Sequence, residues 1–139
     1  MEALYTAIAH ASGGGRDGHV RSEDDRLDLD TRMPTEMGGS GEGTNPEQLF
    51  AAGYSACFLS ALHLVGKRLG IDTTDAGVSA SVSLGNDASG GFGLAVELDV
   101  YIPNATPEQA TEAADAAHQV CPYSNATRGN IDVTIATVQ

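Results

Sequence analysis

Alternating apolar and polar positions mark the first quarter of the chain. Residues 4–9 and 26–30 alternate with a period of two, which is typical of strands that bury one face. Glycine-rich turn signals at residues 13–15 and 17–18 separate the two segments. We therefore expect a small antiparallel sheet in this part of the chain.

A long apolar segment follows a glycine-rich stretch and predicts a helix over residues 46–69. Asn45 is a favourable N-cap residue, Pro46 suits the first helical position, and Gln48 occupies the capping-box position. Gly70 provides a C-terminal stop. Until its last turn, the helix carries apolar or small side chains on nearly every side, which is typical of a helix buried at the centre of a fold.

The second half of the chain predicts a strand pair, a helix and a final strand. Turn-rich residues 85–91 join the two strands, and a cap followed by proline opens an alanine-rich helix at Thr106. That helix should end near Cys121, because Pro122 follows it. The expected strands cover residues 78–84, 92–102 and 131–138. The predicted fold class is α+β with largely antiparallel pairing, in a single domain over residues 1–139.

The charge balance excludes some partners. Nineteen acidic residues against seven Lys and Arg give a net charge of -12, so the chain would repel a nucleic acid backbone. The acidity with a single lysine agrees with a salt-rich setting, although solubility is the simpler explanation. The N-terminus lacks a signal-peptide pattern, and no uninterrupted apolar run reaches the roughly 18 residues of a membrane span. We expect a cytoplasmic protein that binds neither nucleic acid nor membrane.

The two cysteines, Cys57 and Cys121, lie 64 positions apart and form no CxxC motif. A cysteine inside an apolar helix, such as Cys57, is most simply explained as a small buried side chain. If it is reactive, it needs a nearby cation, because lowering a thiol pKa from roughly 8.5 to below neutral requires on the order of 2–3 kcal/mol. Arg16, in a loop whose glycines let the backbone approach a site closely, is the best candidate for that cation.

Cys121 is poorly placed to attack first, since the partial negative charge at a helix C-terminus disfavours a thiolate. A resolving thiol and an inert thiol both fit this position. His118, three residues earlier, makes only a weak metal-ligand pair with it, and no metal site is expected.

Four sequence blocks together resemble the organic hydroperoxide resistance proteins of the OsmC/Ohr family. The two longest are residues 43–58 (GTNPEQLFAAGYSACF) and residues 118–130 (HQVCPYSNATRGN). Residues 14–18 (GGRDG) and residues 91–98 (GFGLAVEL) complete the set, so the resemblance runs through essentially the whole chain.

The resemblance implies a fold, an activity and four site residues. The fold has antiparallel sheets around a long buried central helix and forms an intertwined homodimer. The activity is that of an antioxidant thiol peroxidase: Cys57 attacks an organic hydroperoxide, and Cys121 then closes a disulfide. Arg16 and Glu47 match the active-site arginine and glutamate, with Arg16 stabilising the thiolate and Glu47 orienting the guanidinium by a two-pronged hydrogen bond. No cofactor is implied; a dithiol, such as the lipoyl group of a lipoylated protein, serves as reductant.

Two further hypotheses concern geometry and substrate. Ten residues of helix separate Glu47 from Cys57, about 15 Å along the axis, so we expect Glu47 to reach Cys57 of the other subunit. A pocket lined by Phe50 and Phe58 would favour alkyl or fatty acid hydroperoxides over hydrogen peroxide. The alternatives are an OsmC-type peroxidase of broader peroxide range and a non-catalytic thiol redox sensor.

Overall fold

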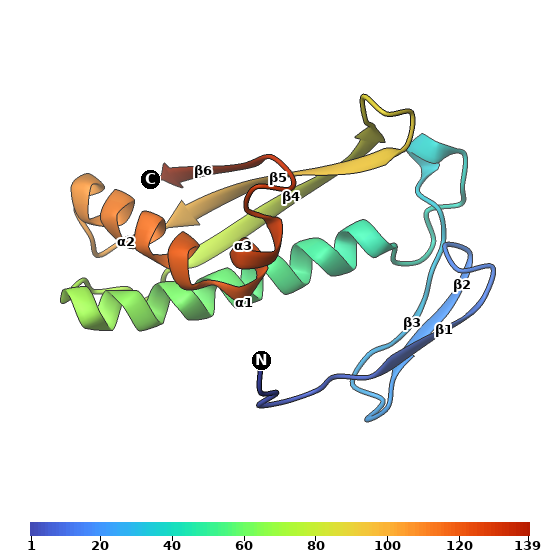
Figure 1. The fold of residues 1–139 in the computed structure, drawn as a ribbon, viewed down its shortest axis with the longest axis horizontal. Coiled ribbons are helices and arrows are strands. Elements are labelled where there is room, and N and C mark those ends of the chain that lie inside the picture. Colours follow the sequence, from blue (N-terminus) through green and yellow to red (C-terminus); the bar gives the residue numbers. More distant parts are fainter. The chain divides into compact units, whose positions relative to one another are not determined.

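The computed structural model describes residues 1–139, which form two compact units, residues 1–49 and residues 50–139. The boundary falls in the first turn of the long helix α1 (Pro46–Leu69). Figure 1 labels the helices and strands of both units. The single domain expected from the sequence stays a prediction.

The first unit contains a three-stranded antiparallel sheet in the order β1-β2-β3. The expected sheet is present, but the strand predicted at residues 4–9 is wrong in position. The chain enters strand β1 only at Ala9, and the β1-β2 hairpin closes where Gly13 pairs with Gly18. A Cβ on Gly18 would lie 2.1 Å from the Ser12 carbonyl oxygen, so the close approach requires glycine. The strands are β1 (Ala9–Gly13), β2 (Gly18–Ser22) and β3 (Asp28–Asp30), followed by the short helix η1 (Thr35–Met37).

The first unit has no apolar core of its own. Its only buried residues are Thr31 and Asn45, and both are polar. Leu4 and Tyr5, which the sequence placed in a strand, are 100% and 81% exposed. The strand pairs of this unit therefore lack the buried apolar face that normally stabilises a small sheet.

The second unit holds the hydrophobic core, between a three-stranded sheet and three helices. Strands β4 and β5 pair antiparallel, and β6 pairs parallel to β5 after a crossover through α2 and α3. Along β5, Val96, Leu98 and Val100 are buried while the residues between them are exposed, so the helices cover one face of the sheet (Figure 1). The elements after α1 are β4 (Gly77–Asn86), β5 (Phe92–Tyr101), α2 (Pro107–Val120), α3 (Pro122–Thr127) and β6 (Val133–Val138).

Local signals set the ends of α1, and the predicted bounds are confirmed. The Asn45 side-chain oxygen accepts a 2.9 Å hydrogen bond from the Gln48 backbone N–H, which satisfies a donor in the first turn. Gly70 ends the helix with a φ of 70°, a conformation that costs glycine little.

Within one chain, α1 is buried on one face only, which differs from the all-round burial expected. The buried face packs into the core of the second unit, whereas Leu64 remains 47% exposed and Leu69 43% exposed. The helix is long and apolar enough to pass a length-and-hydropathy test for a membrane span. Because its buried residues contact the core, we assign it as a core helix.

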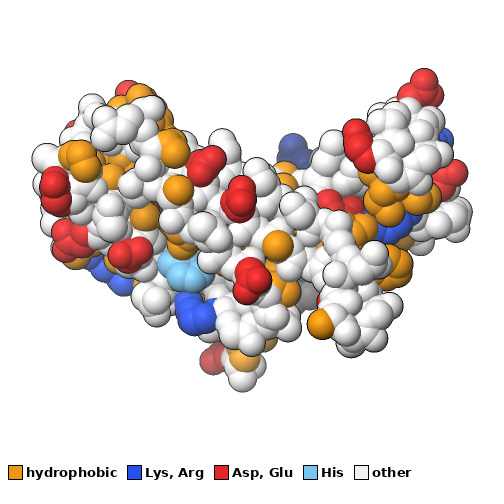
Figure 2. Space-filling model, turned by 90° about the horizontal axis from the view of Figure 1, so that it is seen from above, with side chains coloured by type: hydrophobic (Ala, Val, Ile, Leu, Met, Phe, Trp, Pro, Cys, Tyr) orange, Lys and Arg blue, Asp and Glu red, His pale blue; other side chains and the backbone are white.

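The acidic side chains visible in Figure 2 are dispersed over the face that it shows. They are scattered between apolar and neutral atoms rather than gathered in one patch.

Candidate active site

Cys57 lies in the middle of α1, one turn after the buried Tyr54. It is half-buried at the edge of the core, so its sulfur is more accessible than a core cysteine would be. The interpretation of Cys57 as a fully buried structural residue therefore does not hold.

Cys121 forms the junction between α2 and α3 and is completely buried. Its N–H donates to the Ala117 carbonyl at 2.9 Å, and its own carbonyl accepts from the Asn125 N–H at 3.0 Å. Helix α2 ends at Val120, so its predicted end near Cys121 is confirmed, but the sequence did not predict that a new helix follows at once. Pro122 takes the first position of α3, where the backbone N–H that proline lacks would have no partner within the helix.

This junction changes the electrostatic argument made for Cys121. The residue follows the C-terminus of α2, whose partial charge is negative, and precedes the N-terminus of α3, whose partial charge is positive. The partial charges of these two helix ends oppose each other at Cys121. The C-terminus of α2 is therefore not sufficient by itself to exclude Cys121 as the attacking sulfur.

The structure brings the two sulfur atoms together. The Sγ atoms of Cys57 and Cys121 lie 3.6 Å apart, and both cysteines are free thiols. This separation is longer than the roughly 2.05 Å of a disulfide bond but needs only a small movement to close. Sixty-four residues of sequence separate the pair, so the fold of the second unit creates the proximity.

Within the second unit, the surroundings raise the pKa of the Cys57 thiol. Burial is the main cause, and the neighbouring Cys121 adds to it, while the backbone N–H of Tyr123 acts in the opposite direction. No cation contributes. A reactive Cys57 therefore needs a positive charge that the surroundings of this cysteine pair do not supply.

Arg16 and Glu47 form a two-pronged ion pair within the first unit. Arg16 Nη1 donates to Glu47 Oε2 at 2.9 Å, and Nη2 donates to Oε1 at 2.7 Å. The hydrogen bond from Arg16 lowers the pKa of Glu47, and the same bond raises the pKa of Arg16. The pairing expected from the sequence is confirmed, and it fixes the guanidinium plane while leaving its remaining N–H groups available.

Thr31 holds the loop that carries Arg16. Its hydroxyl donates to the Gly15 carbonyl at 2.6 Å and accepts from the Gly18 N–H at 2.8 Å. Because Thr31 is only 1% exposed, both bonds form away from water. The Arg16 loop is thus fastened on both sides of the arginine.

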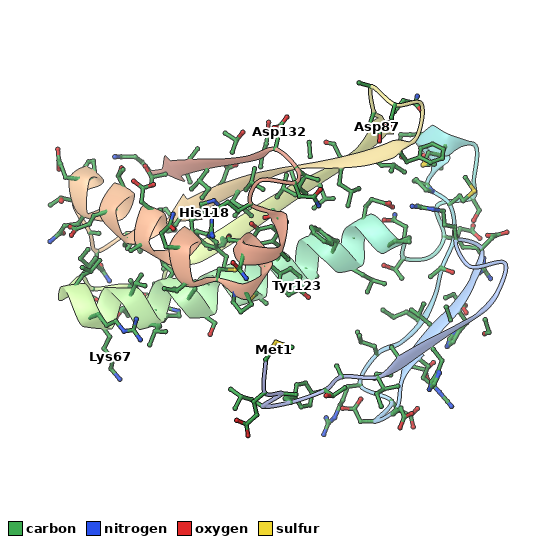
Figure 3. The ribbon with its side chains drawn as sticks, viewed as in Figure 1. Met1, Lys67, Asp87, His118, Tyr123 and Asp132 are labelled. Atoms are coloured by element: carbon green, nitrogen blue, oxygen red, sulfur yellow. The ribbon has the colours of Figure 1, made fainter.

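The aromatic surroundings of Cys57 differ from those predicted. Phe58 is fully buried in the core and cannot line a substrate pocket, because its side chain points to the opposite side from solvent. Tyr123 takes that place: its ring lies 6.0 Å from that of Phe50 and 5.7 Å from that of Tyr54. Tyr123 is labelled in Figure 3 on α3, beside α1. Three aromatic rings thus cluster near the cysteine pair.

A hydrogen-bonded group of side chains, which sequence reasoning missed, lies behind the cysteines. Tyr54, His118, Ser124 and Thr127 are joined by bonds of 2.8–3.2 Å. The sequence placed Tyr54 among the apolar positions of the helix. Hydroxyl residues three positions before Cys57 and three after Cys121 were the signal that could have revealed the group.

Metal ligation has no support from the residues present. No group of three or more His, Cys, Asp or Glu side chains has a geometry that could hold a metal ion. His118 bonds to Ser124 Oγ through Nδ1 at 2.8 Å and makes no ligand pair with Cys121.

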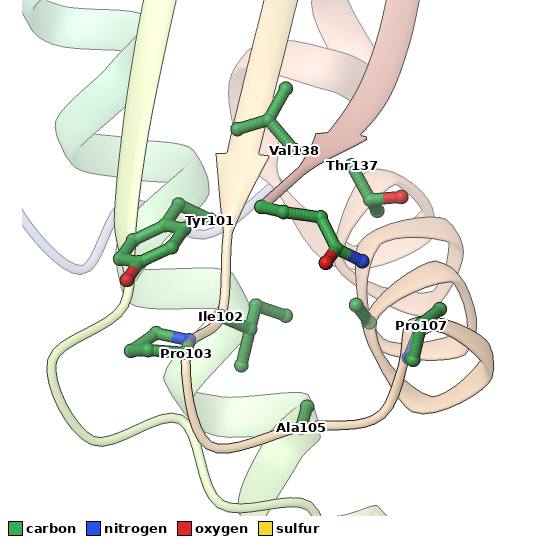
Figure 4. Close-up of a pocket in the computed structure, with 9 residues that line it drawn as sticks. Tyr101, Ile102, Pro103, Ala105, Pro107, Thr137 and Val138 are labelled. Atoms are coloured by element: carbon green, nitrogen blue, oxygen red, sulfur yellow. The ribbon is translucent and has the colours of Figure 1, made fainter.

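A pocket of about 260 Å³ lies elsewhere in the second unit, at the ends of β5 and β6 and the start of α2 (Figure 4). Neither cysteine lines it, so we do not assign it to the candidate site. Its lining residues are Tyr101, Ile102, Pro103, Ala105, Pro107, Ala110, Thr137, Val138 and Gln139.

A family model and two curated relatives all indicate the same family for this chain. Residues 39–136 match the family model described as OsmC-like protein. The organic hydroperoxide resistance protein of Xanthomonas axonopodis pv. citri is 48% identical, over 96% of this chain and 94% of its own. OhrB of Bacillus subtilis, an organic hydroperoxide resistance protein, is 49% identical, over 96% of this chain and 97% of its own. The chain belongs to the organic hydroperoxide resistance branch of the OsmC family.

A solved family structure agrees in fold. The crystal structure of an organic hydroperoxide resistance protein from Elizabethkingia anophelis, with thiocyanate bound, has a TM-score of 0.93 and 51% identity, covering 100% of this chain and 99% of that one. The α+β fold of the OsmC family, with antiparallel sheets and a long central helix, is therefore confirmed. The paired cysteines and the Arg16–Glu47 pair are thus features of a member of this family.

Proposed function

We propose that this protein is a thiol peroxidase that reduces organic hydroperoxides. The observation that carries the proposal is the 3.6 Å approach of the two sulfur atoms, one half-buried and one fully buried. An accessible sulfur meets the oxidant, and a sheltered sulfur next to it closes the disulfide. Relatives named organic hydroperoxide resistance proteins supply the class of oxidant.

The proposed reaction has two steps, followed by reduction of the disulfide. The Cys57 thiolate attacks one peroxide oxygen, the O–O bond breaks, and the departing alkoxide takes a proton to become the alcohol. Cys57 is left as a sulfenic acid, and the Cys121 sulfur displaces its hydroxyl as water to form the disulfide. A dithiol, for which we propose a lipoyl group of a lipoylated protein, then reduces the disulfide by exchange.

Arg16 and Glu47 are the proposed source of the missing positive charge. A cation beside Cys57 would oppose the desolvation that raises its pKa, and the guanidinium could also donate a hydrogen bond to the peroxide. Glu47 holds two of the guanidinium N–H groups, so the orientation of the free groups is set before substrate binds. All four residues, Cys57, Cys121, Arg16 and Glu47, are proposed as catalytic.

Bulky apolar hydroperoxides are the proposed substrates. Phe50 and Tyr123 present partly exposed aromatic rings near the cysteine pair, and an alkyl or fatty acid tail gains binding energy by leaving water against them. Hydrogen peroxide has no such tail. We propose a cytoplasmic setting for the reaction, where dithiol reductants keep the cysteines reduced.

The test is steady-state turnover with two peroxides. With dihydrolipoamide as reductant, we expect kcat/KM for cumene hydroperoxide to exceed that for hydrogen peroxide by at least about tenfold, from the burial of the tail. Equal efficiency would favour a peroxidase of broader range. A single stoichiometric oxidation without repeated turnover would contradict the enzyme and favour a redox sensor.

An intertwined homodimer is the proposed assembly. The first unit lacks an apolar core, and Leu4, Tyr5 and the outer face of α1 leave apolar side chains exposed. A second chain that covers these surfaces would supply the burial that one chain does not. Because about 15 Å of helix separates Glu47 from Cys57, we propose that each active site combines Arg16 and Glu47 of one subunit with the cysteines of the other.

Mixed dimers test this shared site. Cys57→Ser and Arg16→Ala chains should each be nearly inactive alone. After denaturation and refolding together, mixed dimers would hold one complete site, because the first chain supplies Arg16 and the second supplies Cys57. We expect the refolded mixture to recover about a quarter of native activity, since half of randomly formed dimers are mixed and each holds one of two sites.

The outcomes separate the two arrangements. Sites built within single chains would leave the mixture as inactive as its components. Native chains taken through the same refolding cycle show that the procedure itself restores activity. A native mass equal to one chain in sedimentation equilibrium would contradict the dimer directly.

A further inference from the structure

The buried hydroxyl group of Tyr54 connects helix α1, which carries Cys57, to helix α3, which begins directly after Cys121. Tyr54 Oη lies 2.9 Å from Ser124 Oγ and 3.1 Å from Thr127 Oγ1. Tyr54 and Ser124 have no exposed surface, and Thr127 is 4% exposed. These contacts connect α1 to α3, and they lie away from water, where hydrogen bonds are strongest.

The number of hydrogen atoms fixes the direction of every bond in this group. The Thr127 hydroxyl donates to the Ser124 carbonyl at 3.2 Å, so it must accept from Tyr54. Tyr54 then has no hydrogen left and accepts from the Ser124 hydroxyl. Ser124 in turn accepts from His118, which therefore carries a proton on Nδ1. One arrangement satisfies all four contacts, and no buried side-chain polar atom is left without a partner.

His118 is held at the far end of this chain of bonds. Its carbonyl oxygen accepts a 2.6 Å hydrogen bond from Arg128 Nη2, which ties the last turn of α2 to the residue after α3. Figure 3 shows His118 on α2 near the start of α3. The chain of bonds therefore spans α1, α2 and α3, and both helices that meet at Cys121 are fastened to α1.

The position of the group relative to the sulfur atoms gives it a role. Tyr54 stands one helical turn before Cys57, and Ser124 stands one turn after Cys121. An apolar side chain in place of Tyr54 would fill the core equally well, without requiring two hydroxyl partners. We propose that the Tyr54 hydroxyl is a positioning group for disulfide closure, holding the Cys121 turn against α1 so that the resolving sulfur stays within reach of Cys57.

This inference rests on the proposed peroxidase and adds a prediction about its second step. When closure slows, the Cys57 sulfenic acid lives longer. A second hydroperoxide molecule then oxidises it to the sulfinic acid, transferring one oxygen atom and leaving an alcohol. The first step, attack on the peroxide, needs no movement of the Cys121 turn and should be unchanged.

The test uses Tyr54→Phe, which removes one hydroxyl and keeps the ring. We expect disulfide closure to slow by about tenfold, and Cys57 sulfinic acid to increase correspondingly in mass spectra after excess cumene hydroperoxide. The rate constant for the first step should change by less than about threefold. Tyr101→Phe, which removes a hydroxyl from a half-exposed tyrosine of β5, is the matched control and should behave like the native chain.

A second pair of variants guards against a simple loss of folding. Thr127→Val removes the hydroxyl bonded to Tyr54 and should also increase the sulfinic acid, whereas Thr127→Ser keeps that hydroxyl and should restore closure. Native closure rates in both Tyr54→Phe and Thr127→Val would overturn the inference. An equal loss in both chemical steps would also overturn it, because that result indicates general disruption.

Closure can be measured without any peroxidase activity. Diamide takes two electrons and two protons from a dithiol, so it oxidises Cys57 and Cys121 to the disulfide independently of hydroperoxide. Two results together would refute the proposed function and uphold the positioning role. Diamide would close the disulfide slowly in Tyr54→Phe, and the native protein would fail to reduce hydroperoxides. If diamide closes the disulfide of Tyr54→Phe at the native rate, and the native protein turns over hydroperoxide normally, the positioning role alone is refuted.

Discussion

Replacing Cys57 with serine is expected to lower hydroperoxide turnover by at least about 10³-fold, because an alcohol is a far weaker nucleophile than a thiolate at neutral pH. The half-buried position of Cys57 and its 3.6 Å approach to Cys121 are the reasons for proposing it as the sulfur that meets the oxidant first. Consumption of cumene hydroperoxide with dihydrolipoamide as reductant measures the effect.

Cys121→Ser provides the contrast. Without a resolving sulfur, Cys57 should still reduce about one equivalent of hydroperoxide per chain and then stop as an oxidised cysteine. A burst in Cys121→Ser with no burst in Cys57→Ser supports the assigned order. The reverse pattern would show that Cys121 attacks first and would exchange the two roles.

Replacing Arg16 with alanine is expected to lower kcat/KM by about 10²–10³-fold at pH 7. A cation beside a thiol lowers its pKa, and without it burial leaves the Cys57 thiol mostly protonated. The thiolate fraction then grows only as the pH rises through the higher pKa. The rate of Cys57 alkylation by iodoacetamide, measured against pH, should shift to higher pH in the variant.

The pH profile separates activation from loss of folding. The deficit of Arg16→Ala should narrow as the pH rises from 7 to 9, because the native thiolate fraction levels off there while the thiolate fraction of the variant, whose Cys57 pKa is raised by burial, is still growing. Arg21→Ala removes a positive charge from an exposed position of β2 and should keep the native profile. An Arg16→Ala profile identical to the native one would rule out a role of this arginine in thiolate formation.

Strong local signals made the helices predictable. Asn45, Pro46 and Gly70 act through contacts and conformations within a few residues of themselves, and α1 begins and ends where they indicate. Helix α3 was missed because a proline after a helix is read as a stop, although the same residue can occupy the first position of a new helix. Ser124 and Thr127 of this helix bond to the buried Tyr54, a partner about 70 residues away that no local pattern reveals.

The strands of the first unit and the site were predictable to different degrees. Residues 4–9 alternate like a strand but have no apolar layer to pack against in this chain, so the alternation misplaced β1. Cys57, Cys121, Arg16 and Glu47 were predicted as site residues because sequence blocks that resemble the family surround them, and the structure pairs the two cysteines with each other and Arg16 with Glu47. The environment of Cys57 was not predictable, since helical periodicity does not distinguish the core side chain Phe58 from the partly exposed Phe50.

The parallel pairing of β6 with β5 has a consequence for how the chain is made. Cys121 lies in the crossover between those strands, and the last strand of the sequence must dock before the crossover is complete. As the ribosome releases the chain from its N-terminus, Cys57 emerges long before the segment that will face it. We therefore expect Cys57 of a newly synthesised chain to stay without its partner sulfur until the segment that carries Cys121 has also left the ribosome and folded.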